Sequence, residues 1–416
     1  MTGATSLRTP TDPLAKALTL KRAGKLAFVP PRYGADVVGG AETVLREMAT
    51  GLACRGWDVE VLTTCARDHF SWANEYPAGL DEVDGLAVRR FPTVVPTSRR
   101  ERAEHEAGLL GGRTLTLADQ QRWINADLRV PDLFHHLLDT AGEYRAIVLG
   151  PYMFWTTFAG WQLAPGKTVL LPCAHDEPYI RLELFRPMFA GVAVLMFHTE
   201  PEHELAHSVV PSLAPHAVVG SGMHVPAGYD PERVRAKYGL DDRFLLYAGR
   251  REGAKGWERL LEGFARASLR RDLPFSLVTI GSGDVHPPAA VADRVRDLGF
   301  VADEDRNDLF AAAEAYLQPS AHESFSRTIM EAWLAGTLVI GNAASPVVTW
   351  HCERSGAGLV YEDDYELEQC LLFLAEAPEA AARLAAGGRS YVVDTYAFDA
   401  VMDRVEDCLE RWTTAP

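Results

Sequence analysis

Several things that the sequence lacks narrow its possible functions. The six cysteines include no Cys-x-x-Cys pair and no zinc-finger spacing, which argues against a metal cluster or a redox motif. No apolar run approaches the roughly 20 residues that cross a bilayer, and the basic cluster at 21–25 precedes too short an apolar stretch for a signal peptide. A basic surplus is also missing, since the net charge of −16 disfavours broad contact with nucleic acid. We therefore expect a globular protein of the reducing cytoplasm.

The 416 residues contain alternating short apolar runs and helical patterns. This alternation predicts an α/β fold of two doubly wound, Rossmann-like, mostly parallel sheets in series. The strands expected in the first series are 26–30, 58–64, 86–91, 146–150, 167–173 and 192–197, and those in the second are 244–248, 275–280, 315–318, 337–341 and 358–361.

The pattern also predicts where the domains divide. A loose arm at 1–24 precedes an N-terminal domain at 25–225, and a C-terminal domain at 240–395 is followed by a helix at 396–416 that packs back toward the N-terminal domain. The charged, helical stretch at 97–138 interrupts the first series and reads either as a solvated excursion or as part of an acceptor cleft. Ligands bind beyond the carboxyl ends of such strands, so we expect the site between two facing domains.

The strongest local motif contains Glu323 and Glu331, eight positions apart at the start of a helix. With the helix starting near Ser324, they are separated by about 12 Å along its axis. Glycosidases need carboxyls at about 5–5.5 Å or 6.5–9.5 Å, so the two are a poor hydrolytic pair. They suit a long ligand with hydroxyl groups at both ends and a phosphate at the helix N-terminus between them. The alternative is an ordinary helix start with acidic residues nearby.

A second motif follows the expected strand 244–248. Arg250 and Lys255 lie on a loop that leads into a helix and can clamp a diphosphate, arginine in bidentate fashion and lysine as a compact charge. Both charges would stabilise a departing nucleotide diphosphate. A solvated basic loop remains the alternative.

A glycine pair, Gly39 and Gly40, follows the first expected strand. It lacks the Gly-x-Gly-x-x-Gly spacing of a dinucleotide fold, so an oxidoreductase is disfavoured. Two glycines at a helix N-terminus permit close approach to a phosphate or a sugar, although a lone pair more often marks a tight turn.

Asp303 and Asp305 form an Asp-x-Asp pattern that in other contexts holds a metal ion. They precede an amphipathic helix, where acidic residues favour the helix dipole. We therefore expect no metal site.

Together these residues resemble the retaining glycosyltransferases of family 4, which have the two-domain GT-B fold. The resemblance runs from about residue 26 and is strongest over 244–341. It implies that Arg250 and Lys255 bind the diphosphate, that Glu323 contacts the donor sugar, and that Glu331 contacts the ribose. The other donor-binding residues that the resemblance implies are Gly39, Gly40, Gly281, Gly283, Phe300, Val301, Ser324, Phe325 and Ser326.

The chain departs from the family around its central phenylalanine. Ser324 and Ser326 stand where the family usually has glycine, and Arg327 and Thr328 replace a usual Leu-Pro. We expect a narrower and more polar pocket beside the sugar.

The loop after the strand 167–173 corresponds to one that often offers a histidine to the donor sugar. His175 is that residue here, and Asp176 and Glu177 are candidates for acceptor contact. A lone histidine can equally be a satisfied surface or core group.

The resemblance implies a metal-independent transfer, without a cofactor, from a nucleotide-diphosphate sugar to a hydroxyl group on a glycan, a lipid-linked molecule or a small molecule. A GT-B epimerase or phosphorylase, or a non-catalytic sugar-nucleotide sensor, remains an alternative. Membrane-surface contact through 89–102 is not favoured. The sequence identifies neither donor nor acceptor, and it leaves the oligomeric state open.

Overall fold

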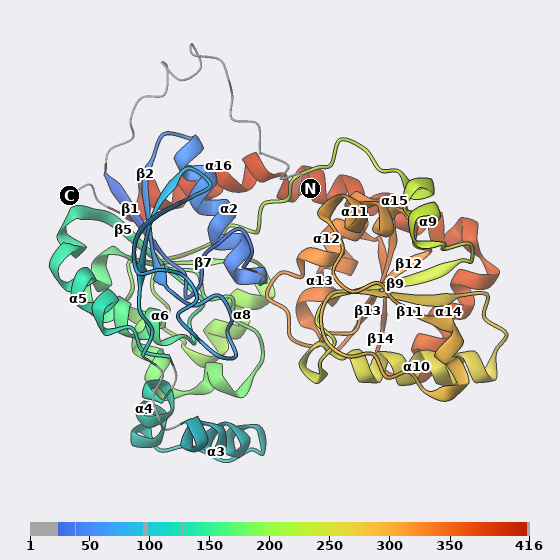
Figure 1. Cartoon of the computed structure of the whole chain (residues 1–416), viewed down its shortest axis with the longest axis horizontal. Helices are drawn as coiled ribbons and strands as arrows, with labels where there is room; N and C mark the ends of the chain where they lie inside the picture. The colour runs from blue at the N-terminus through green and yellow to red at the C-terminus, as the bar shows by residue number, and fades with distance from the viewer. Residues whose placement is uncertain (1–23, 38, 95–98, 127, 414–416) are drawn as a thin grey trace, which may run out of the picture.

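The computed structural model describes residues 24–37, 39–94, 99–126 and 128–413. The chain forms two α/β domains, each built on its own sheet (Figure 1). The prediction of two doubly wound sheets is confirmed. Most of the expected arm, residues 1–23, lies outside the described residues, and so do residues 97, 98 and 127 of the expected insertion.

The first sheet has eight strands in the order β3-β4-β2-β1-β5-β6-β7-β8, and all neighbours except β3 and β4 run parallel. Its strands are β1 Lys25–Val29, β2 Asp58–Thr64, β3 Gly79–Val83, β4 Leu86–Phe91, β5 Tyr144–Leu149, β6 Thr168–Leu170, β7 Val194–Phe197 and β8 His216–Val218.

The second sheet has six parallel strands in the order β11-β10-β9-β12-β13-β14. Its strands are β9 Phe244–Ala248, β10 Ser276–Ile280, β11 Val295–Asp297, β12 Ala315–Gln318, β13 Leu338–Asn342 and β14 Gly358–Tyr361.

The central strands are apolar on both faces because helices cover both faces of each sheet. In β1, Leu26 and Phe28 join one buried cluster while Ala27 and Val29 join another on the opposite face. Parallel strands buried on both faces read as continuous apolar runs, which is why the sequence revealed them.

Three strands escaped the prediction, and all lie at or beside a sheet edge. The residues of β3 are mostly exposed, and it pairs antiparallel with β4 at the edge of the first sheet. β8 and β11 contain only three residues each; β8 lies at the opposite edge of the first sheet, and β11 lies at one edge of the second. An edge strand buries little, so its sequence carries little apolar pattern.

The helices fill the connections between strands. They are α2 Gly40–Cys54, α3 Arg99–Leu110, α4 Leu117–Asn125, α5 Pro131–Thr140, α6 Trp155–Gly160, α7 Arg186–Gly191, α8 Glu200–Val209, α9 Pro231–Tyr238, α10 Trp257–Arg270, α11 Asp303–Ala312, α12 Arg327–Leu334, α13 Pro346–Ser355, α14 Asp364–Glu376, α15 Pro378–Tyr396 and α16 Phe398–Trp412. No helix among the described residues has both the length and the apolar character to span a bilayer.

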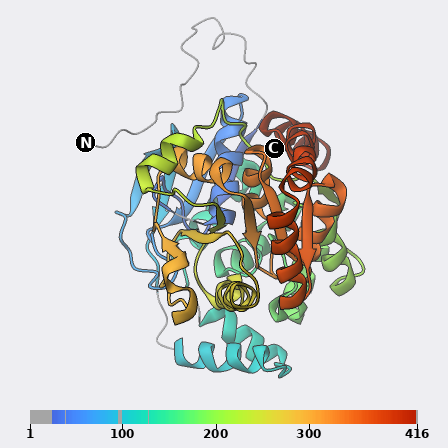
Figure 2. The same ribbon diagram turned by 90° about the vertical axis from the view of Figure 1, so that its right-hand side faces the viewer.

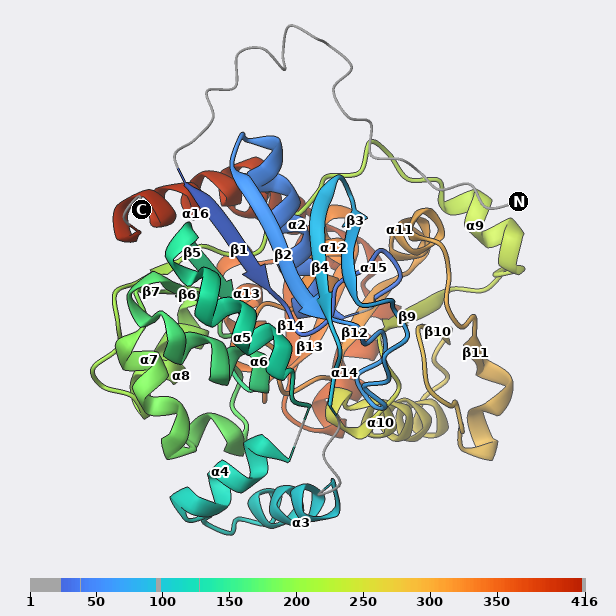
Figure 3. The ribbon, with the colours of Figure 1, turned by 60° about the vertical axis from the view of Figure 1, so that its left-hand side comes forward.

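The final helices link the two domains. Figure 2 looks onto the C-terminal domain and shows the red helices running along its side, and Figure 3 shows α16 beside the first sheet. Arg55, just after α2, forms ion pairs with Asp399, Asp403 and Glu406 of α16. The indole of Trp57 also donates a hydrogen bond to Glu406.

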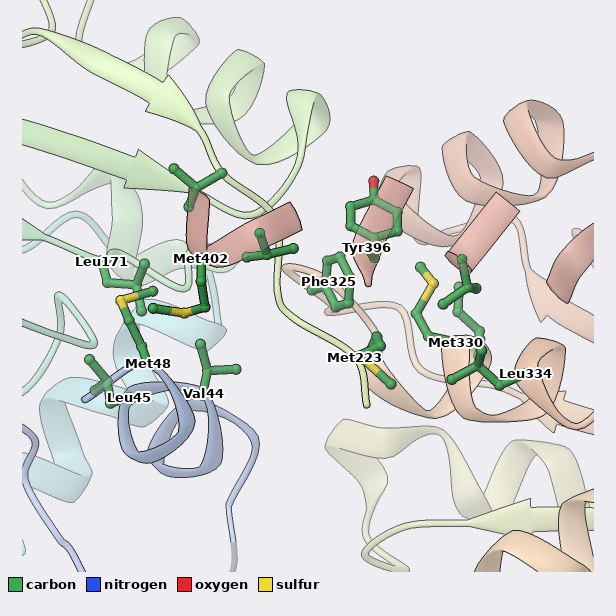
Figure 4. Close-up of a cluster of buried hydrophobic side chains, with 14 of the residues drawn as sticks. Val44, Leu45, Met48, Leu171, Met223, Phe325, Met330, Leu334, Tyr396 and Met402 are labelled. Atoms are coloured by element: carbon green, nitrogen blue, oxygen red, sulfur yellow. The ribbon is translucent and has the colours of Figure 1, made fainter. Parts of the chain in front are cut away.

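One buried cluster contains side chains of both domains (Figure 4). It includes Met48 of α2, Met402 of α16, and Phe325 beside Tyr396. Because this apolar surface is shared, the two sheets are held with their loops facing each other.

Candidate functional site

The candidate site lies where loops from the two sheets meet. In each sheet the strand order reverses at the centre, between β1 and β5 in the first and between β9 and β12 in the second. Loops at such a reversal diverge and leave room for a ligand. The residues selected from the sequence follow β1 and β6 in the first sheet, and β9, β10, β11 and β12 in the second.

The loop after β9 carries two arginines with different surroundings. Arg251 is buried and donates hydrogen bonds to the carbonyls of Gly281 and Gly283, at 3.2 and 3.0 Å, and it pairs with Asp297 at 3.1 Å. Arg250 has a 45% exposed side chain that pairs with Glu252. Of the two arginines, Arg250 is therefore the one free to meet a ligand.

The glycines of the next loop let it pack against this one. Gly281 has φ +124°, and a Cβ on it would lie 2.1 Å from the carbonyl oxygen of Gly249. Gly283 has φ +103°, and a Cβ there would lie 2.8 Å from the carbonyl oxygen of Arg251. Both positions exclude a side chain, so the turn holds the arginine loop in place.

Lys255, after β9, forms an ion pair with Glu323, after β12. Its Nζ lies 2.8 Å from Oε1 of Glu323, whose side chain is 13% exposed. The approach is close because Gly256, at φ +72°, faces the carbonyl of Pro319, which a Cβ would contact at 2.5 Å. Two residues selected from separate motifs thus form one ion pair.

The helix after Glu323 begins later than predicted. Its first residue is Arg327, and Ser326 caps it in the left-handed conformation at φ 63°. A residue in that conformation interrupts the helix, so the expected start near Ser324 is wrong. Ser326 is buried, and its hydroxyl accepts a hydrogen bond from the Gln318 amide at 2.7 Å. The left-handed φ favours glycine, and here the Gln318 contact supports a serine instead.

The neighbours of Ser326 differ in their surroundings. Phe325 is 3% exposed and packs edge-on against Tyr396 and His351, with ring centroids 4.9 and 5.4 Å apart, so its side chain supports the turn from behind. The carbonyl of Ser324 accepts a hydrogen bond from the Thr199 hydroxyl of the first domain at 3.1 Å.

The remaining residues that were predicted to bind the donor are more dispersed. Glu331 pairs with Arg306 of α11 at 3.2 Å and has a 14% exposed side chain. Phe300 is 68% exposed, while Val301 packs partly against the shared core. Asp305, from the Asp-x-Asp pattern, is buried and pairs with Arg233 and Lys237.

Gly39 and Gly40 open α2 on the N-terminal side. A Cβ on Gly39 would lie 2.1 Å from Oε2 of Glu42, a carboxylate that Arg32 clamps at 2.5 Å. Because the ion pair cannot easily move, Gly39 cannot readily carry a side chain. A Cβ on Gly40 would meet nothing within 4 Å.

His175 and Glu177 approach the C-terminal domain from the loop after β6. Nδ1 of His175 lies 3.3 Å from Oε1 of Glu177, and its ring centroid lies 5.8 Å from that of His322. Burial lowers the pKa of His175 to about 4 and raises the pKa of Glu177 to about 7. The pair is therefore poorly described as an ion pair, since burial favours the neutral form of each. Asp176 instead pairs with Arg181 and is exposed.

Two further residues of this region were not selected from the sequence. His69, after β2, has Nε2 3.4 Å from Arg250, and burial and the charges of Arg32 and Arg250 lower its pKa. His322 immediately precedes Glu323 and faces His175. Both histidines follow a strand, and this position could have marked them as candidates in the sequence. Their partners depend on how the two domains pack together.

The family comparison matches the second domain. A family model described as "Glycosyl transferases group 1" matches residues 242–376. These residues include Arg250, Lys255 and both glutamates of the strongest motif.

Curated relatives are similar over different spans. Mannosylfructose-phosphate synthase of Agrobacterium fabrum is 27% identical over 138 residues, which cover 27% of this chain and 30% of that protein. D-inositol 3-phosphate glycosyltransferase of Kineococcus radiotolerans is 25% identical over 360 residues, which cover 76% of this chain and 75% of that protein. The first of these matches therefore spans less than a third of that relative's length.

Solved structures are similar over almost the whole chain. Anabaena HepE in complex with UDP-glucose superposes with a TM-score of 0.68 at 16% identity, covering 93% of this chain and 100% of that one. A likeness at this identity establishes the fold, which is GT-B.

Proposed function

The chain belongs to the group 1 glycosyltransferases, also called family 4, and on that premise we propose that it moves a sugar from a nucleotide-diphosphate donor to a hydroxyl acceptor with retention of configuration. The observation that carries the proposal is the meeting of Lys255 and Glu323 beside His175, from the opposite domain. A cation, a carboxylate and an imidazole at one place suit a sugar joined to a diphosphate.

The leaving group is stabilised from the C-terminal domain. Lys255 and Arg250 carry the positive charge that a departing diphosphate requires, in the role that a metal ion plays in other enzymes. The first-turn N–H groups of α12 lack partners within the helix and add donors. When the diphosphate binds, Lys255 shares its charge between the phosphate and Glu323.

The sugar and the nucleoside bind on either side of the diphosphate. Glu323 and His175 bind the sugar hydroxyls as positive charge develops at the anomeric carbon, and Glu331 holds the ribose. The acceptor hydroxyl attacks from the face that the diphosphate leaves. Glu177, with a pKa of about 7, lies beside His175 and accepts a hydrogen bond from the acceptor.

The similar proteins indicate which donors and acceptors to test first. A fold neighbour was solved with UDP-glucose, so UDP-sugars come first. The names of two relatives contain a phosphorylated polyol or sugar, which makes such compounds the first acceptors to try.

The test is a thermal-shift screen with UDP-, GDP-, dTDP- and ADP-sugars, followed by product analysis with the best donor. We expect one donor to raise Tm and to be consumed slowly by hydrolysis and faster with the correct acceptor. A donor that binds without any turnover would indicate a sensor, and a product formed without acceptor would indicate an epimerase. Sugar transfer to inorganic phosphate would indicate a phosphorylase.

A further inference from the structure

Three side chains that face one another across the domains form a set of metal-ligand type. His175 and Glu177 follow β6 in the first domain, and His322 follows β12 in the second. One ligand atom from each lies within 4.8 Å of the other two. Within the described ranges, no other three histidine, cysteine or acidic side chains meet this condition.

Two ring atoms of this set have no hydrogen bond. The Nδ1 atoms of His175 and His322 are buried and have no hydrogen-bond partner among the described residues. The 3.3 Å contact from His175 to Glu177 has the separation of an ion pair without the geometry of a hydrogen bond. Buried polar atoms are normally satisfied, so an unpartnered nitrogen on each of two histidines that lie in one cluster with a carboxylate calls for a partner.

We propose that the three side chains bind a divalent transition-metal ion of the zinc class. Two imidazoles and one carboxylate are ligands that Zn²⁺ accepts, with a fourth position left for water or a ligand. The ligand atoms would close to about 3.3 Å apart, the edge of a tetrahedron whose bonds are about 2.0–2.1 Å. Small movements of two loops supply this contraction.

The charges around the set permit a cation. Lys255 and Arg181 are both nearby positive groups, and ion pairs with Glu323 and Asp176, respectively, offset their charges. Among the three ligands, the carboxylate of Glu177 can supply a negative charge to the ion.

The ion acts as an inhibitor and not as a participant in transfer. It occupies His175, which the proposed function assigns to the donor sugar, and it ties a loop of one domain to a loop of the other. Zinc binding itself does not depend on the proposed function, whereas inhibition does. We therefore expect zinc to raise Tm and to compete with the donor.

The binding test is calorimetric titration of the full chain with ZnCl₂. A second group of imidazoles, His203, His207 and His216, has ring centroids 6.1 and 4.4 Å from the central His203 and could bind zinc weakly at the surface. The reference protein therefore carries H203A and H207A, which removes this competing group. Its Tm without zinc verifies that it folds.

Two variants in that background decide the assignment. H322Q and E177Q should each weaken zinc binding at least about tenfold. Loss of a group that only orients a ligand lowers metal affinity by about that factor, and loss of the ligand itself should lower it at least as much. Co²⁺ should give the visible absorption of a four-coordinate site in the reference protein and not in H322Q. Zinc heats that are equal in the reference protein and in both folded variants would overturn the proposal, and so would a reference protein that binds no zinc.

The activity test separates this proposal from the proposed function. H322Q should retain transfer and lose inhibition by zinc. If the reference protein binds zinc through His322 but transfers no sugar, the metal site stands and the proposed function fails.

Discussion

The two sheets share a strand order but differ in what their loops carry. The orders β4-β2-β1-β5-β6-β7 and β11-β10-β9-β12-β13-β14 correspond strand for strand. In the second domain the loops after the strands carry an exposed arginine and a Lys255–Glu323 ion pair. In the first they carry a glycine turn, and an imidazole and a carboxyl group whose neutral forms burial favours.

The comparison indicates that one strand order can support two different sets of loop residues. The family model matches 242–376, and this span contains Arg250 and the Lys255–Glu323 ion pair. The first domain instead carries two additional strands and the helices α3 and α4, which lie below both sheets in Figure 1. We infer that the second domain holds the common donor and the first adapts to an individual acceptor.

The largest expected effect comes from removing the charge that the second domain supplies. Lys255→Ala should lower kcat by about 10²-fold, because the leaving diphosphate loses a preorganised cation. Steady-state kinetics with the best donor measures it. Lys237→Ala is the matched control, since Lys237 also pairs with a carboxylate, Asp305, but between the helices α9 and α11. Wild-type kcat in Lys255→Ala would contradict the division of tasks.

The two adjacent arginines should separate stability from function. Arg251→Ala removes a buried guanidinium that ties two loops and should cost about 2–3 kcal/mol of unfolding free energy. Arg250→Ala should leave Tm unchanged and lower kcat/KM about tenfold. Thermal unfolding and kinetics on both variants check this. Equal losses of Tm in the Arg250 and Arg251 variants would contradict the assignment of a structural role to Arg251 alone.

The contact between the domains should show a smaller coupling. Arg327, which begins α12, pairs with Glu47 of α2 at 3.0 Å and also donates to the Ser221 hydroxyl. A double-mutant cycle with Arg327→Ala and Glu47→Ala should give a coupling energy of about 1 kcal/mol, because both side chains are partly buried. Additive effects in denaturant unfolding would show that the pair does not link the domains.

The smallest effect should come from the ion pairs of the last helix. Arg55→Ala removes contacts to Asp399, Asp403 and Glu406, two of which are mostly exposed. We expect a loss of about 1 kcal/mol, since solvent screens the pairs with Asp399 and Asp403, and the buried Glu406 keeps its hydrogen bond from Trp57. Met402→Ala, in the apolar contact of the same helix, should cost more, about 2–4 kcal/mol. A larger loss of unfolding free energy in Arg55→Ala than in Met402→Ala, measured by denaturant unfolding, would mean that ion pairs contribute more than apolar packing to the attachment of α16.

How far the fold was predictable depended on burial. The sequence predicts the central strands Asp58–Thr64 and Ala315–Gln318 with the same bounds as the structure, because their β-rich segments are typical of strands in a covered sheet. The edge strand Gly79–Val83 was not predicted, because it exposes most of its residues. The predicted start of α12 was wrong because Ser326 has a left-handed φ that its residue type does not indicate. A glycine at this position would have suggested such a φ and hence a later helix start.

The sequence could relate those candidate residues that are close to one another along the chain. Arg250 with Lys255, and Glu323 with Glu331, are related by spacing alone, and the resemblance assigned their tasks. The partners that face them were not predictable in this way. Arg251 differs from Arg250 only in burial, which the sequence does not show.

What the sequence determined by itself was local: which segments form strands, which loops follow them, and which charges those loops carry. The tertiary structure alone decided that Arg250 faces His69, 181 positions away, and that His175 faces His322. Strand periodicity arises within a few residues, whereas contacts across the cleft depend on how two cores pack together. That packing sums many weak apolar contacts along the whole chain, so no single segment encodes it.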